Sequence, residues 1–355
     1  MKILFCDFLC QRGNQHIDSR IINMLSDGHE IFLMEDRDFF RGEIKNKERV
    51  KFLGNRYSDN PQGAIAYKIQ ILRRMWLAAS VAKKIEPDLI YVSVYDAIVF
   101  PIGLLRFKKN QKIVVVENDN IDLLTNRIHE MTYRMFAHKV HHIVYESFFG
   151  EYLINNFQIP KEKIHVIPHL CFGKEKIEDA CEIKNYSQAD CICISWSNDE
   201  DIIRNLIEKE KKEHFFRNNK ITCRIKSKKY SFKNEYLCVD NGFLETVLYD
   251  KLYDECKCVL IPFPKQYHYR MSGSIIDAAS HHKKMITTDF ELAKYYYQKY
   301  GSIIEVTSDI DDMLEAIKRN CLGNEDLCLD FSKFEIDHSE LQVQNCLKEM
   351  LENIG

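Results

Sequence analysis

A turn of small polar residues carries the most specific chemistry in the sequence. Ser272, Gly273 and Ser274 follow a polar-aromatic loop and begin a segment of helical periodicity. Backbone N–H groups at the start of a helix bind anions, so this turn predicts a phosphate site. Arg270 precedes the turn and could hold a diphosphate, and Asp277, one helical turn further on, could hold a ribose or sugar hydroxyl. The alternative is that Ser272 is an ordinary helix N-cap.

The segments around this turn predict where it lies in a sheet. Cys258–Ile261 is an apolar run typical of a buried parallel strand, and Pro262 and Pro264 end it. A second short strand is expected at Met285–Thr288. This order of elements places the turn beyond the carboxyl end of a strand, where open α/β sheets bind their ligands.

Alternating strands and helices are predicted from one end of the chain to the other. The other strands are expected at Ile3–Leu9, Glu30–Met34, Leu89–Val94, Ile113–Glu117, Val140–Tyr145, Ile164–Ile167, Cys191–Ser195, Ile221–Lys226, Leu237–Asp240 and Ile303–Val306. Helices are expected between them, including a continuous one at Ile121–Ala137, whereas Glu35–Asn60 is expected to be an irregular insert. The pattern predicts an α/β protein with two Rossmann-like doubly wound domains facing a central cleft.

The expected boundaries divide the chain into three parts. Residues 1–168 form the first domain and residues 169–338 form the second. The final helix, within residues 339–355, is expected to leave the second domain and pack on the first, because it carries an apolar face that must be buried. The polar stretch Gly323–Asp337 is expected to be the crossing segment.

Charge limits the classes of partner. The net charge of −3 over 355 residues carries no nucleic-acid footprint. Residues 1–170 hold 24 Lys and Arg against 20 Asp and Glu. This basic half favours peripheral contact with an anionic membrane surface or a phosphorylated acceptor, and random asymmetry is the alternative.

Cysteine and histidine usage predicts a reduced, metal-free protein. The chain has 13 cysteines, an odd number, with no C-x-x-C pair, which suits a reducing cytosol. The two His-His pairs have no further ligand at metal-binding spacing. The sequence runs directly into its first strand, and no apolar run approaches about 18 residues. We therefore expect a cytoplasmic protein or one at the periphery of a membrane.

Five segments resemble, in order, those of GT-B nucleotide-sugar glycosyltransferases, in particular the retaining family-4 type. They are GNQHIDSRIINMLSDGHEI, KIHVIPH, NGFLETVLYDKLYDECKCVLIPF, YRMSGSIIDAASHHKKMITTD and YYYQKYGSIIEVTSDIDDMLEAI. The resemblance implies an enzyme that moves a sugar from a nucleotide-sugar donor to a glycan or lipid-linked acceptor in cell-surface polysaccharide synthesis. Because the helix-terminus N–H groups and Arg270 supply positive charge, we expect the reaction to need no metal, and no cofactor besides the nucleotide-sugar substrate.

The resemblance also implies roles for individual residues. The turn at 272–274 contacts the donor diphosphate, and Asp277 holds the donor ribose or sugar. Gly242, in a loop after a second-domain strand, belongs to the donor side. Gly13 and Asn14 form the loop near the reacting sugar and the acceptor.

Two departures from the family bear on activity. Only one carboxylate of the family's E-x7-E pair is present, because Tyr269 takes the first place. The loop at 195–200 has no Arg or Lys where the family has a basic pair. A leaving diphosphate needs positive charge, so Arg270 is expected to supply it, with Arg224 and Lys226 as helpers. The alternative for these two helpers is a solvated surface charge.

Other assignments stay open. Asp119 follows a predicted strand, where it could act as a base or orient an acceptor hydroxyl, or could belong to a plain turn or helix cap. A D-x-D motif at Asp36 and Asp38 would suit a manganese-dependent GT-A enzyme. Glu35 and Asp36 lie where an NAD enzyme has its ribose-binding acid. A GT-B-shaped binding protein that has lost its activity is a further alternative.

Overall fold

The computed structural model divides into two compact units. Unit 1 comprises Met1–His169 and Glu340–Gly355, and unit 2 comprises Leu170–Ser339. The structure describes residues 1–9, 14–35, 37–40, 43–54, 63–171, 188–241, 246–323 and 329–355. Gly13, Asp36 and Gly242 lie outside these ranges.

Within these ranges unit 1 contains a seven-stranded parallel sheet. Its strands are β1 (Lys2–Asp7), β2 (Glu30–Leu33), β3 (Val50–Phe52), β4 (Leu89–Val94), β5 (Ile113–Val116), β6 (His141–Val144) and β7 (Ile164–Val166). They lie in the order β3-β2-β1-β4-β5-β6-β7, so the chain reverses its direction across the sheet between β1 and β4.

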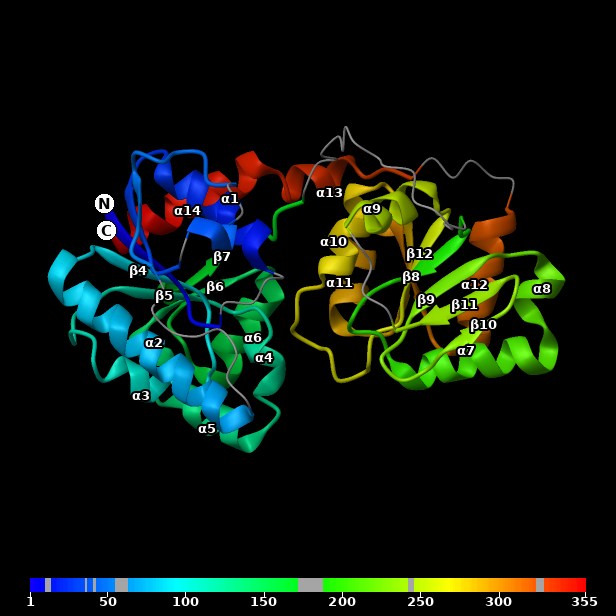
Figure 1. Cartoon of the computed structure of the whole chain (residues 1–355), viewed down its shortest axis with the longest axis horizontal. Helices are drawn as coiled ribbons and strands as arrows, with labels where there is room; N and C mark the ends of the chain where they lie inside the picture. The colour runs from blue at the N-terminus through cyan, green and yellow to red at the C-terminus, as the bar shows by residue number, and fades with distance from the viewer. Residues whose placement is uncertain are drawn as a thin grey trace. The chain divides into compact units, whose positions relative to one another are not determined.

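Helices cover both faces of this sheet (Figure 1). On one face lie α1 (Gln15–Ser26) and α14 (Glu340–Ile354). The other face carries α2 (Ala64–Ile85), α3 (Phe100–Leu104), α4 (Asn120–Leu123), α5 (Arg127–Arg134) and α6 (Ser147–Phe157). Right-handed crossovers explain the division, because the strand order reverses after β3.

Unit 2 repeats the plan. Its described strands are β8 (Cys191–Cys193), β9 (Cys223–Lys226), β10 (Phe232–Lys233), β11 (Leu237–Asp240), β12 (Cys258–Ile261), β13 (Lys284–Thr288) and β14 (Ile304–Thr307). They lie in the order β10-β11-β9-β8-β12-β13-β14 and pair in parallel, except for the antiparallel edge strand β10. The reversal here falls between β8 and β12.

The helices of unit 2 also form two layers (Figure 1). One layer holds α7 (Glu200–Glu213), α8 (Phe215–Asn219) and α12 (Ile310–Leu322), which pack on one face of the sheet. The other layer holds α9 (Thr246–Glu255), α10 (Gly273–Ser280) and α11 (Glu291–Tyr300), and α13 (Ser332–Asp337) contacts α10.

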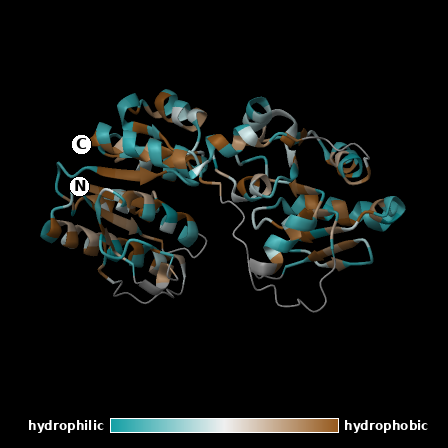
Figure 2. Ribbon diagram, turned by 90° about the horizontal axis from the view of Figure 1, so that it is seen from above, coloured by the Kyte–Doolittle hydropathy of each residue, from teal (hydrophilic) through white to brown (hydrophobic). Residues whose placement is uncertain are grey.

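Burial on both faces explains the composition of the central strands. The four residues of β5 (Ile113–Val116) are all buried, as are the four of β12. Such strands need apolar side chains at every position rather than at alternate positions. Figure 2 shows this as strands coloured predominantly as hydrophobic in both units.

The C-terminal helix belongs to unit 1. α14 contacts α1 and β7 and buries Val343, Leu347 and Met350. Its amphipathic pattern therefore finds its apolar partner in the first Rossmann-like unit rather than in the second. The predicted fold class, two Rossmann-like α/β units with a final helix that returns to the first, is confirmed.

Three expectations for local structure were wrong. The stretch Glu35–Asn60 contains β3, which pairs with β2 through Ile31 and Val50, because a short edge strand needs only one buried residue. The helix expected at Ile121–Ala137 is broken into α4 and α5, since the Asn126 side chain accepts from Ile128 N and caps a new helix. The crossing segment contains α13, whose Phe334 is buried.

Candidate functional site

The turn at the start of α10 lies beyond the carboxyl end of β12. The Ser272 hydroxyl accepts a hydrogen bond from Ile275 N at 3.2 Å, so this serine is the N-cap of α10. The N–H groups of Gly273 and Ser274 have no acceptor among the described residues. A Cβ added to Gly273 would meet open space. The helix therefore presents two N–H groups that an anion can approach closely.

A tyrosine on α9 orients the carboxylate of Asp277. The Tyr249 hydroxyl donates to Asp277 Oδ2 at 2.7 Å, and the Tyr253 hydroxyl lies 3.4 Å from that of Tyr249. Burial first, and then the neighbouring Tyr253 and Asp277, raises the pKa of Tyr249 well above its ordinary value. The phenol therefore stays protonated and donates to the carboxylate.

The Tyr249–Asp277 pair was not predicted from the sequence. Tyr249 and Tyr253 are four residues apart on a predicted helix, which places them on one side of it. That spacing was the feature of the sequence that could have indicated a pair of neighbouring tyrosine hydroxyls. The helix could not be connected to Asp277, 28 residues away, before the fold was known.

Arg270 packs against the loop that precedes the turn. Its guanidinium carbon lies 4.8 Å from the centroid of the Tyr267 ring, and that ring lies edge-on to Phe263 at 5.5 Å. The side chain is half-buried. A cation held over an aromatic ring thus stands two residues before the N-cap of α10 in the chain.

Arg224 and Lys226 project from the same face of β9, but they have different surroundings. Arg224 Nη2 lies 3.3 Å from Asp240 Oδ2, so part of its charge is compensated. Lys226 Nζ lies 4.8 Å from the centroid of the Trp196 ring, and Lys228 Nζ lies 4.9 Å from it. Burial is the first cause that lowers the pKa of Lys226. Neither Arg224 nor Lys226 is a simple solvated charge.

Trp196 and Lys228 were not assigned a role from the sequence. Trp196 is 59% exposed, although it is large and aromatic. It stands in the loop after β8, where the family's basic pair is missing. The neighbouring strand end therefore brings two ammonium groups to the loop that has none of its own.

Hydrogen bonds tie the loops of unit 2 together at the strand-order reversal. Asp199 N donates to Pro262 O at 2.6 Å, joining the loop after β8 to the loop after β12. The buried Asn198 side chain donates to Cys193 O at 3.2 Å and to Lys226 O at 2.9 Å. Three strand ends are thereby held at one edge, the position where doubly wound sheets bind ligands.

In unit 1 the sequence-based candidates lie at the carboxyl edge of the sheet. Asn14 immediately precedes α1, and Asp119 immediately precedes α4. Both side chains are half-buried, and neither makes the side-chain hydrogen bond of an N-cap. Gly13 falls outside the described residues, as does Gly242 in unit 2.

A buried group of carboxylates stands at the same edge of unit 1. Asp7 N donates to Glu35 Oε1 at 3.0 Å, and the Ser93 hydroxyl donates to Asp18 Oδ2 at 2.9 Å. Burial, followed by the Asp7 carboxylate, raises the pKa of Glu35 to about 8 and that of Asp18 well above its ordinary value. The Glu35 carboxyl group therefore holds a proton at neutral pH.

The position of Glu35 opposes the NAD alternative. Its side chain is 2% exposed, and one of its oxygens accepts from the backbone of β1. A ribose-binding acid must reach the ligand, whereas Glu35 points into the protein. No group of three or more His, Cys, Asp or Glu side chains in the described ranges could hold a metal ion.

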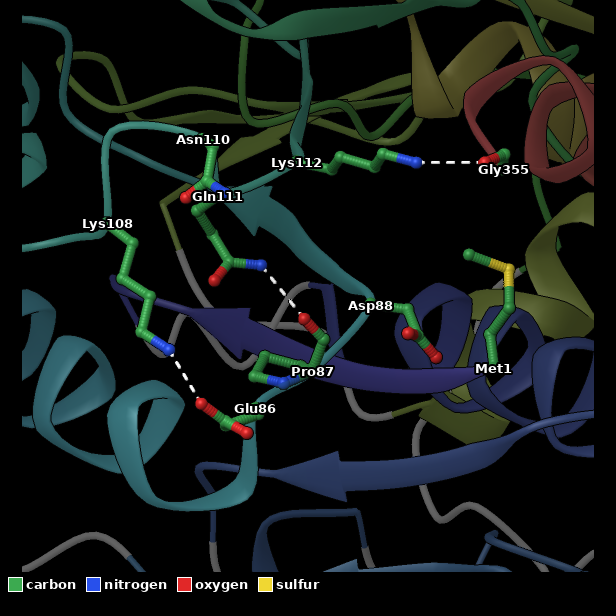
Figure 3. Close-up of a pocket in the computed structure, with 9 residues that line it drawn as sticks. All are labelled: Met1, Glu86, Pro87, Asp88, Lys108, Asn110, Gln111, Lys112 and Gly355. Atoms are coloured by element: carbon green, nitrogen blue, oxygen red, sulfur yellow. Dashed lines mark hydrogen bonds and ion pairs between the residues drawn. The ribbon is translucent and has the colours of Figure 1, made fainter.

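A pocket of about 490 Å³ lies at the opposite edge of the unit 1 sheet (Figure 3). Its walls include Lys108, which pairs with Glu86 at 2.8 Å, and Lys112, which donates to Gly355 O at 2.9 Å. Met1 and Asp88 lie at the amino-terminal ends of β1 and β4. This edge offers strand starts rather than helix N-termini, so we do not place the site there.

No family model matches the chain, and no curated protein matches its sequence. Solved structures match it over nearly its whole length. UDP-GlcNAc 2-epimerase from Neisseria meningitidis bound to UDP-GlcNAc has 14% identity and a TM-score of 0.58, and the match covers 100% of this chain and 99% of that one.

Two further structures match 99% of this chain and 99% of their own. Anabaena HepE in complex with UDP-glucose has 12% identity and a TM-score of 0.64. The lipopolysaccharide outer core galactosyltransferase WaaB, in its apo form, has 12% identity and a TM-score of 0.58. At this identity the likeness shows the fold, which is that of two-domain GT-B proteins.

Proposed function

We propose that the chain is a glycosyltransferase that moves a sugar from a nucleoside-diphosphate sugar to a glycan or lipid-linked acceptor. The observation that carries the proposal is the start of α10, where two free N–H groups lie near Arg270 and one helical turn before Asp277. Two of the matched structures hold UDP-sugars, which supports a donor of this class.

Different residues of unit 2 bind different parts of the donor. The N–H groups of Gly273 and Ser274 bind the diphosphate, and Arg270 balances its charge. Asp277, oriented by Tyr249, accepts hydrogen bonds from the ribose or sugar hydroxyls. The helix N-terminus and the cations stabilise the leaving diphosphate as charge develops on it, so the reaction proceeds without a divalent ion.

Trp196 and the lysines beside it extend this site. The exposed indole offers a flat face for the nucleotide base, and Lys226 and Lys228 add two charges at the neighbouring strand end. Arg224 acts indirectly, because its ion pair with Asp240 compensates the negative charge of that carboxylate.

In unit 1, the carboxyl edge receives the acceptor. Gly13 and Asn14 belong to the loop near the reacting sugar, and Asp119 orients or deprotonates the acceptor hydroxyl. The proposal includes transfer with retention of the anomeric configuration and a role in cell-surface polysaccharide synthesis. It also includes a reducing cytoplasmic location, which the ten free cysteines of the described residues favour.

Calorimetry of UDP binding tests the donor site. A charge-assisted hydrogen bond contributes about 1.5–3 kcal/mol, so Arg270→Ala should weaken binding tenfold or more. Arg217→Ala, which removes an exposed arginine from α8, is the matched control and should leave the affinity unchanged. Equal affinity in the wild-type protein and Arg270→Ala would remove Arg270 from the site, and no binding of any nucleoside diphosphate would overturn the proposal.

A second activity is favoured by the match to UDP-GlcNAc 2-epimerase over the whole chain. Such an enzyme inverts a sugar carbon without an acceptor. Incubation with UDP-GlcNAc alone, followed by NMR, distinguishes the two: a C2 epimer would indicate an epimerase. Nucleotide binding with neither epimer nor transfer product would indicate a binding protein that has lost its activity.

A further inference from the structure

The outer helical layer of unit 1 exposes apolar side chains that such layers ordinarily bury. On α2, α5 and the turns after α3 and α5, exposed fractions run from 47% at Ile69 to 81% at Leu105. We call this surface the apolar face and define it by Ile65, Ile69, Leu105, Ile128, Met131 and Met135. Single exposed apolar residues are normal, whereas a contiguous group of them marks an interaction surface.

These residues lie on single helical stripes. Ile65 and Ile69 are four residues apart on α2, and Ile128, Met131 and Met135 follow one another at spacings of three and four. Residues at such spacings share one side of a helix. Each stripe faces solvent, because the side chains packed inward are different residues, such as Ile71 and Met75 on α2.

Ring contacts join the helices into one layer. The Arg106 guanidinium lies 5.0 Å from the ring of Trp76, connecting the turn after α3 to α2. The Phe100 ring of α3 lies 4.9 Å from that of Phe136, just after α5. Figure 1 shows α2, α3 and α5 on the same side of the sheet, and α1 and α14 on the other. The exposed stripes therefore belong to neighbouring helices of one layer, on the same side of unit 1.

The same surface is basic. α2 carries no Asp or Glu, and Arg106 is exposed in the turn after α3, next to Leu105. Arg73 on α2 and Arg127 on α5 are exposed in the same stripes as the apolar residues. Isoleucine, leucine, methionine and tryptophan interleaved with arginine and lysine are typical of helices that lie in a bilayer interface.

We infer that the apolar face docks on an anionic lipid bilayer. The apolar side chains enter the acyl boundary, and Arg73, Arg106 and Arg127 reach lipid phosphates. None of the described helices could cross a bilayer, so the contact is peripheral. A second copy of this chain, pairing through the same face, would bring like charges together. The inference rests on the proposed function in one respect, since it favours a lipid-linked acceptor over a free glycan.

Vesicle flotation of the full chain tests the inference. The protein should float with phosphatidylcholine vesicles that contain phosphatidylglycerol and much less with phosphatidylcholine alone, and added salt should release it. Ile128→Glu together with Met131→Glu should lower binding about tenfold or more, because two apolar side chains leave the interface. Arg73→Glu should lower it about fivefold or more.

Leu341→Glu provides the matched control. Leu341 is 67% exposed on α14, which covers the other face of the sheet, so binding should be unchanged. Thermal unfolding of each variant checks folding, which substitutions at exposed positions should preserve. The inference would be overturned if the wild-type protein did not bind anionic vesicles. It would also be overturned if Leu341→Glu lost as much vesicle binding as the Ile128→Glu, Met131→Glu variant.

Sedimentation velocity tests the alternative that a second copy of this chain binds to the apolar face. A concentration-dependent dimer that dissociates in the α5 variant, with no flotation of the wild-type protein, would assign the face to a second copy. These readouts need no nucleotide. Failure of UDP binding with intact flotation would refute the proposed function and leave the membrane surface in place, and the reverse result would refute only the membrane surface.

Discussion

The two units place opposite chemistry on the same edge of the same fold. Both sheets reverse their strand order beside their first strand, between β1 and β4 in unit 1 and between β8 and β12 in unit 2. At that edge unit 1 holds Asp18 and Glu35, whereas unit 2 holds Lys226, Arg270 and the start of α10. The sheet topology determines where a ligand can bind, and the side chains at that edge determine which ligand charge is favoured.

The difference supports the diphosphate site proposed in unit 2. Asp18 and Glu35 are buried at the edge of unit 1, where desolvation and the Asp7 carboxylate raise their pKa values. An anion bound at this edge would make ionisation of these carboxyl groups still less favourable, whereas a neutral, hydroxyl-rich molecule would not. The acceptor of the proposed reaction is such a molecule.

The largest expected effect concerns the pH dependence of unit 1. Glu35 has a pKa raised from 4.5 to about 8, so the folded state holds its proton more tightly than the unfolded state. Its contribution to stability is complete below about pH 4.5 and is lost as the pH rises through about 8. One pKa unit corresponds to about 1.4 kcal/mol, so the loss amounts to several kcal/mol.

Glu35→Gln should therefore be more stable than the wild-type protein at pH 9 but not at pH 5. The amide keeps an oxygen for the hydrogen bond from Asp7 N. Denaturant unfolding at both pH values measures the difference, and Glu48→Gln, at an exposed position, is the control. Parallel stability profiles for Glu35→Gln and the wild-type protein would show that Glu35 is ionised in the folded state.

A second prediction reverses the charge of the edge of unit 2. Replacing Lys226 and Lys228 by Glu should weaken UDP binding at least about tenfold, because two charges change sign near the diphosphate. Lys229→Glu makes the same change at the next exposed position and should have little effect. In a Trp76→Phe protein, UDP should quench the fluorescence of Trp196, the second of the two tryptophans. Absence of quenching would place the base elsewhere.

A smaller effect is expected when the donor carboxylate loses its orientation. Tyr249→Phe removes the 2.7 Å hydrogen bond to Asp277 Oδ2 and leaves the ring in place. A hydrogen bond contributes about 0.5–1.5 kcal/mol, so transfer should fall about threefold to tenfold. Tyr253→Phe, at the next hydroxyl, should change transfer less. Equal transfer rates for Tyr249→Phe and the wild-type enzyme would show that Asp277 does not depend on this contact.

The smallest effect is expected from metal removal. The cations and the helix N-terminus of unit 2 supply the positive charge that a leaving diphosphate needs, so EDTA should leave transfer unchanged. Loss of activity in EDTA and its recovery with manganese would overturn this assignment. That result would favour the alternative in which the D-x-D motif at Asp36 and Asp38 binds manganese.

Much of the fold could be predicted from the sequence because periodicity is local information. Leu89–Val94, Leu237–Asp240 and Cys258–Ile261 have the same limits in the sequence-based prediction and in the structure. Apolar runs and helical stripes reflect burial directly, so buried strands and amphipathic helices are the elements that a sequence predicts best. The N-cap of α10 was also readable, since Ser272 acts on residues three positions away.

The sequence by itself thus determined the alternating elements, the small-residue turn and the apolar stripe of the final helix. Tertiary structure alone decided which distant residues meet: Tyr249 with Asp277, Lys226 and Lys228 with Trp196, and Asp7 with Glu35. These contacts join strand ends and helices that are distant in the sequence, so no local sequence pattern predicts them. The raised pKa values follow from them as well, because desolvation depends on what the whole fold buries.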